Sequence, residues 1–126
     1  MKLESELPGK SNIYIKHYVP GKNIRLLNKN YYNSLIIKNN KILHSLWECE
    51  STSFLSEKDT KLILGEEDSE IYLLGTGKFF SFPTKNIFAS FAKVGKSLDC
   101  MKSESACTTF NLLSLENRNV TAAIIL

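Results

Sequence analysis

The sequence predicts a three-layer α/β fold. In it, a central, mostly parallel sheet is flanked by helices, and the N-terminal half adds a small antiparallel β layer or hairpin. Residues 70–126 alternate short apolar runs with two helical patterns, and such alternation predicts parallel pairing through right-handed crossovers. The run Ile71–Leu74 has no polar alternation, which is typical of a strand covered on both faces. The N-terminal half instead holds β-rich segments separated by turn residues.

The first helix of this C-terminal region is predicted to begin at Thr84. Its hydroxyl can accept a backbone N–H of the first turn. Gly95 is expected to end the helix, because glycine adopts the left-handed conformation without a Cβ clash. The apolar stripe is Ile87, Phe88, Phe91 and Ala92. Residues 97–101 then form the next predicted strand.

A second helix is predicted to follow, with Ser103 as its N-cap. Glu104 beside it favours the positive end of the helix dipole, and Asn117 is expected to end the helix. Residues 120–126 form the last predicted strand, in which Ala122 and Ala123 allow a neighbouring helix to pack closely.

The N-terminal half contributes shorter elements. We expect residues 1–11 to be a flexible segment and residues 12–126 to be a single globular domain. Residues 13–19 are β-rich, and the following Pro20-Gly21 pair suits a type II turn. Residues 24–27 resume an extended segment.

Residues 35–38 and 41–44 flank Asn39-Asn40 and predict a hairpin, since asparagine tolerates positive φ. In this register Ile37 faces Ile42 and Ile36 faces Leu43 on the opposite side. Both faces are therefore partly apolar, which indicates a ribbon between other elements. Residues 56–59 fit a capping box for a short helix that ends at Gly65.

Composition excludes several classes of protein. The chain has 126 residues, of which 43% are hydrophobic and 23% charged, as in a soluble globular protein of one domain. A net charge of +3 is too small and evenly spread to indicate nucleic acid binding. No apolar run reaches the length of a membrane helix, and no secretory signal is visible. Three cysteines without CxxC spacing indicate reduced thiols, so we expect a cytoplasmic protein.

A longer motif runs through the C-terminal half. Its residues are Gly75-Thr76-Gly77, Pro83, Gly95, Met101, Ser103, Ala106-Cys107, residues 109–113, Glu116, Arg118, Val120 and Ala122-Ala123. The chain resembles, over residues 13–126, a small domain-of-unknown-function family. Its members include bacterial and archaeal single-domain proteins, an adipogenesis-associated animal protein and a mitochondrial respiratory complex I assembly factor.

The resemblance implies the same layered fold and supplies no catalytic residues. Three positions depart from the family pattern: Thr108 replaces an arginine, Phe110 a tyrosine and Asn117 a glycine. Losing the arginine weakens any argument for anion binding on this helix.

Gly75, Thr76 and Gly77 follow a predicted strand, where ligands of α/β proteins tend to bind. We therefore consider a ligand cleft there, although the loop has neither a GK[ST] ending nor a GxGxxG spacing. The alternative is a tight turn. The other candidate residues of this cleft are Ser103, Cys107, Asn111 and Arg118.

Two of these further residues have a structural alternative. Cys107, near a helix start, is either an activated thiol or a small core residue. Arg118 either binds an anion or partner carboxylate or pairs within the chain. His17 and His44 lack the spacing of a metal site, so we predict no metal and no cofactor.

Phe79, Phe80 and Phe82 follow the glycine turn directly. If exposed, they form an apolar patch of the kind that marks partner sites. If buried, they cover the end of the sheet.

Two functions follow from these observations. The first is a non-catalytic protein-interaction or assembly-factor-like module, with an unidentified protein partner and a possible homodimer. The second is a small-ligand-binding protein or enzyme that uses the cleft beside Gly75–Gly77. The absence of a catalytic set favours the first, so we do not expect an enzyme.

Overall fold

The computed structural model describes residues 12–126. The flexible segment predicted for residues 1–11 lies outside the described residues. The strands are β1 (Ile15–Val19), β2 (Asn23–Leu26), β3 (Lys29–Tyr31), β4 (Ser34–Lys38), β5 (Ile42–Trp47), β6 (Ile71–Gly75), β7 (Leu98–Met101) and β8 (Val120–Ile124). The helices are the short 3-10 helix η1 (Thr52–Phe54), α2 (Glu57–Leu64), α3 (Lys85–Ala92) and α4 (Ser103–Leu115).

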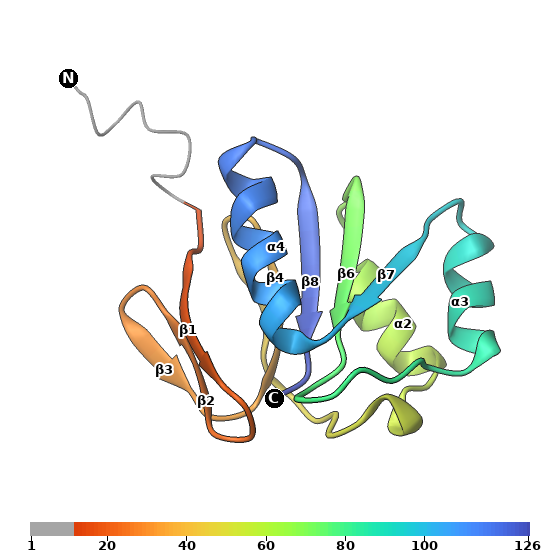
Figure 1. The fold of residues 1–126 in the computed structure, drawn as a ribbon. Helices are drawn as coiled ribbons and strands as arrows, with labels where there is room; N and C mark the ends of the chain where they lie inside the picture. Colours follow the sequence, from red (N-terminus) through yellow and green to blue (C-terminus); the bar gives the residue numbers. More distant parts are fainter. Residues whose placement is uncertain (1–11) are drawn as a thin grey trace.

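The strands form two sheets. A five-stranded sheet has the order β5-β4-β8-β6-β7, and β1, β2 and β3 form a separate antiparallel sheet. Strands β6, β7 and β8 are parallel, as the crossover argument predicts. Their carboxyl ends all point toward the bottom of Figure 1.

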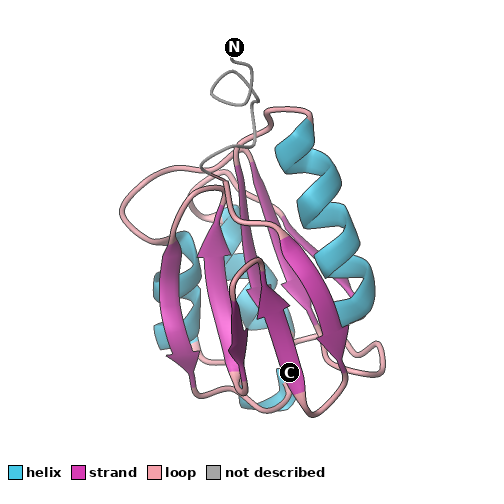
Figure 2. Cartoon of the chain, turned by 90° about the vertical axis from the view of Figure 1, so that its left-hand side faces the viewer, coloured by secondary structure: helices cyan, strands magenta, loops and turns pink. Residues whose placement is uncertain are grey.

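Both faces of the large sheet are covered, because its strands carry large apolar side chains on alternating sides. On one face, Tyr72 and Leu74 of β6 pack with Ile63 of α2 and Phe91 of α3. On the other, Leu73 packs with residues of α4 and of the small sheet. Figure 1 shows α4 and the small sheet on one side of the large sheet and α2 and α3 on the other, and Figure 2 shows α4 beside the strands with the other helices behind them. An α/β fold is thus confirmed.

The expectation of a mostly parallel sheet is met only in part, because the sheet is mixed. Strand β4 pairs antiparallel with both β5 and β8. The predicted hairpin therefore belongs to the large sheet and not to the small antiparallel layer, which is made by β1–β3. The physical reason is burial. Leu35, Ile36 and Ile37 are all fully buried on alternating faces, which suits a central strand.

The hairpin register is half as predicted. Ile37 pairs with Ile42, but Ile36 pairs with His44 and not with Leu43, because an irregularity shifts the register between these pairs. Neither turn asparagine has positive φ; among the non-glycine residues from position 12 onward, only Asn117 does.

The predicted helix boundaries have identifiable causes. The Asp59 carboxylate accepts the Ser56 backbone N–H at 2.9 Å, as a capping box requires, and also accepts the Trp47 indole N–H at 2.9 Å. Helix α3 ends where Gly95 adopts a φ of 75° and Lys96 N–H donates to the Phe91 carbonyl, the pattern of a Schellman motif. Thr84 is the N-cap of α3, but its side chain makes no capping hydrogen bond.

Helix α4 approaches β6 closely at Gly75. A Cβ atom built at Gly75 would lie 2.9 Å from the Ser103 Cα and 3.1 Å from the Ala106 Cβ. Only glycine allows this approach, since a contact with backbone at such a distance forces the helix to move. Gly75 therefore sets the distance between the N-terminus of α4 and the sheet.

We predict that Gly75→Ala lowers the free energy of unfolding by about 1–3 kcal/mol, the usual cost of overpacking a core. Urea denaturation followed by circular dichroism measures this change. The matched control is Gly95→Asn: no atom lies within 4 Å of its Cβ position, and asparagine tolerates the left-handed conformation. A Gly75→Ala variant as stable as the natural chain would contradict the proposed close contact.

Candidate functional site

The loop that leaves β6 contains Gly75, Thr76 and Gly77, and its polar groups bond within the chain. The Thr76 hydroxyl donates to the Phe79 carbonyl at 2.8 Å and accepts the Ser81 N–H at 3.3 Å. Thr76 N–H donates to the Met101 carbonyl of β7. Gly77 has a φ of 106°, which explains the glycine. The loop is therefore a structured turn that presents the residues after it.

Ser103 is buried against this loop. Its hydroxyl accepts the Gly77 N–H at 2.8 Å and donates to the Ile125 carbonyl at 2.6 Å. The expected N-cap role is wrong: Lys102 is the N-cap and Ser103 is the first helical residue. The hydroxyl is directed to the sheet because β6 and β8 both end beside it, each with a backbone group that needs a partner.

Cys107 and Asn111 lie further along α4 and also face inward. Cys107 is buried, and this burial raises the pKa of its thiol to about 12, so the thiolate needed for nucleophilic chemistry is disfavoured. The Asn111 amide accepts the Ile15 N–H at 2.9 Å and donates to the Ile15 carbonyl at 2.8 Å. Asn111 thus holds β1 against α4.

Arg118 lies at the opposite end of the molecule. It follows α4 in the connection to β8, which is at the top of Figure 1, whereas the loop after β6 is at the bottom. Arg118 Nε donates to the Glu70 carboxylate at 3.2 Å. This hydrogen bond and a second one from the Asn119 N–H hold the pKa of Glu70 below its ordinary value.

The structure therefore does not bring the seven candidate residues into one cleft. Gly75, Thr76, Gly77 and Ser103 meet at the carboxyl end of the parallel strands. Cys107 and Asn111 point elsewhere along α4, and Arg118 is at the other end of the sheet. Among residues 12–126 there is no group of three or more histidine, cysteine or acidic side chains that could hold a metal ion.

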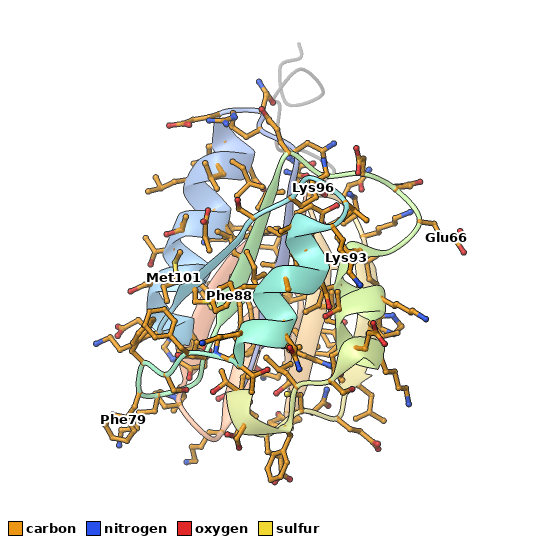
Figure 3. All side chains as sticks on the ribbon, turned by 90° about the vertical axis from the view of Figure 1, so that its right-hand side faces the viewer. Glu66, Phe79, Phe88, Lys93, Lys96 and Met101 are labelled. Atoms are coloured by element: carbon orange, nitrogen blue, oxygen red, sulfur yellow. The ribbon has the colours of Figure 1, made fainter. Side chains whose placement is uncertain are left out.

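The three phenylalanines are at the surface. Phe79 exposes 73% of its area, Phe82 68% and Phe80 46%. Phe80 and Phe82 stack edge to face with ring centroids 4.7 Å apart, and the Lys78 ammonium lies 5.5 Å from the centre of the Phe79 ring. Figure 3 shows Phe79 projecting from the lower edge of the molecule. We call residues 78–82 the phenylalanine loop.

A groove of about 420 Å³ adjoins this loop. Among its lining residues are Thr76, Gly77, Lys78, Phe79 and Glu50. Of the predicted cleft residues, Thr76 and Gly77 line it, whereas Ser103, Cys107, Asn111 and Arg118 do not.

A larger groove of about 650 Å³ continues from the first along β5. Sequence reasoning missed it. Three of its lining side chains, Tyr32, Leu46 and Phe54, each expose 66–70% of their area. One signal was available: Phe54 follows the polar run Glu50–Ser53 and has no apolar periodicity that would bury it. We call this groove the β5 groove.

These observations define a class of protein: an α/β scaffold whose polar motif residues make hydrogen bonds within the chain and whose exposed phenylalanines follow the carboxyl end of β6. The family model described as "Protein of unknown function (DUF498/DUF598)" matches residues 15–125. The chain belongs to this family, as the C-terminal motif predicted.

Three similar proteins illustrate the relationship. A protein of Francisella tularensis subsp. holarctica named "13 kDa major membrane protein" is 39% identical over 114 residues, which are 90% of each chain. A Bordetella parapertussis structure superposes with a TM-score of 0.79 at 18% identity, covering 91% of this chain and 96% of the other. A structure described as an outer membrane protein from Bartonella henselae has a TM-score of 0.77 at 24% identity, covering 91% and 95%. These two structures support the fold.

The names of two relatives mention membranes. In the part of this chain that the structure describes, no helix has both the length and the apolar character needed to cross a bilayer.

We predict that Ser103→Ala lowers the free energy of unfolding by about 2 kcal/mol or more, because it leaves a buried N–H and a buried carbonyl without partners. Chemical denaturation provides the measurement. Ser105→Ala, an exposed position on the same helix, is the control and should change stability by less than about 0.5 kcal/mol. Equal effects of the two substitutions would show that the Ser103 hydroxyl does not hold the two strand ends.

Proposed function

We propose that this chain is a three-layer α/β scaffold that acts as a non-catalytic protein-interaction module, similar in role to an assembly factor. Its working surface is the phenylalanine loop. The observation that carries the proposal is the exposure of Phe79 and Phe82. Water-exposed rings of this size are unfavourable unless a partner covers them.

The phenylalanine loop is preorganised for contact with a partner. Its backbone is fixed by the Thr76 hydroxyl and by the bond between Gly77 and Ser103. A fixed loop loses little conformational entropy on binding, which improves affinity. The rings of Phe80 and Phe82, which stack edge to face, also lose little rotamer freedom on binding.

We propose a cytoplasmic location for the protein. A partner that is itself bound to a membrane would account for the name of the Francisella relative, and it requires no spanning segment in this chain.

A second candidate function is binding of a small ligand in the groove beside Gly77, with or without catalysis. The groove of about 420 Å³ favours it, because Lys78, Glu50 and Ser51 line this groove with polar groups. In this second candidate function Ser103 and Asn111 do not bind the ligand, since both side chains make hydrogen bonds within the chain.

We predict that Phe79→Ser combined with Phe82→Ser abolishes binding of the main protein partner, because the substitutions remove the apolar contact area. Cross-linking in the native cell, followed by mass spectrometry, compares the partners of the natural chain and the variant. The control is Leu112→Ser, which removes an exposed apolar side chain of α4.

The proposal requires a partner that is recovered with the natural chain and with Leu112→Ser but lost with the double variant. Recovery of the same partners with all three proteins would refute the phenylalanine loop as the surface. Native mass spectrometry of the purified natural chain tests the second candidate, which requires an added small-molecule mass.

A further inference from the structure

The β5 groove is apolar on its walls and acidic at its rim. Tyr32, Leu46 and Phe54 supply exposed apolar surface. The charged residues among its lining are Glu48 and Glu50, which are both exposed. Within residues 12–126, neither carboxylate takes part in an ion pair. The groove therefore suits an apolar side chain that is accompanied by a cation.

The phenylalanine loop displays this chemistry. Phe79 is the most exposed large apolar side chain of the described residues, and Lys78 lies directly before it with its ammonium close to the ring. The loop does not fill the β5 groove of its own chain, since 73% of Phe79 remains exposed.

The loop and the groove are neighbours on the surface. The smaller groove touches Lys78 and Phe79 on one side and shares Gly21, Glu50 and Leu126 with the β5 groove on the other. When one chain carries two adjacent complementary surfaces, a two-fold dimer can form the same contact twice, with the loop of each copy against the groove of the other.

We propose that the chain forms a two-fold dimer in which the phenylalanine loop of each copy enters the β5 groove of the other, with Lys78 facing Glu48 and Glu50. The second copy supplies both the ring and the cation that the groove lacks. The acidic rim also disfavours an anionic membrane as the occupant. The proposal rests on the proposed function in one respect, namely that the phenylalanine loop is a binding surface.

Analytical ultracentrifugation of the full chain over a range of concentrations tests the dimer. The natural chain should sediment with twice the monomer mass at high concentration. Phe79→Ser should weaken self-association by about tenfold or more, as expected for a central aromatic contact. Lys93→Glu, which changes an exposed lysine outside both grooves, should leave the association unchanged. Circular dichroism verifies that each variant is folded.

Charge exchange gives a sharper test. Lys78→Glu and the double variant Glu48→Lys with Glu50→Lys should each be monomeric alone, because each places like charges together in both contacts. An equimolar mixture should form a heterodimer, since every loop then meets a groove of opposite charge.

A natural chain that stays monomeric, or a mixture that does not associate, would overturn the proposal. These outcomes are distinct from failure of the proposed function. A monomer whose cellular partner is lost in the Phe79→Ser and Phe82→Ser variant refutes only the dimer. A dimer with no other partner refutes only the wider assembly role.

Discussion

The structure depends on how β8 ends between two buried serines. The Ser103 hydroxyl joins Gly77 N–H to the Ile125 carbonyl. On the other side, the Ser34 hydroxyl accepts the Leu126 N–H at 2.8 Å and donates to the Cys49 carbonyl at 2.8 Å. Each hydroxyl acts as donor and acceptor at once, so it satisfies two backbone groups where the ladder stops. Helix α4, β4 and the exits of β6 and β8 are thereby fixed to one another.

In this arrangement the polar residues of the motif stabilise the fold, and the apolar residues that follow them lie at the surface. The polar residues of the motif suggest a functional site when only the sequence is read. In the structure they form hydrogen bonds that hold the scaffold together. The apolar residues that follow them are directed outward, because the turn at Gly77 carries the chain off the end of the sheet. A loop fixed at its base and apolar at its tip is suited to contact another protein.

The opposite end of the sheet is closed in a different way. Lys38 is buried, and its ammonium donates to the Ser69 hydroxyl and to the carbonyls of Glu67 and Asp68. Burial lowers the pKa of this lysine, while the nearby Glu67 carboxylate acts in the opposite direction. The Ser69 hydroxyl bonds in turn to Thr121 of β8. Here a polar network closes the sheet, whereas the phenylalanine loop lies at the other end.

The sequence by itself determined the local elements. The apolar run before Gly75, the turn at Gly21, the helix end at Gly95 and the parallel strands that flank two crossovers all follow from spacing and turn chemistry, which act over a few residues. Only the tertiary structure decided which distant residues contact one another. Spacing does not reveal that Asn111 bonds to Ile15, that Ser103 faces the sheet, or that β4 pairs with β8. It also does not reveal that Tyr32, Leu46 and Phe54 line one groove. These contacts join distant segments, and their energies arise only once the chain has closed around a common core.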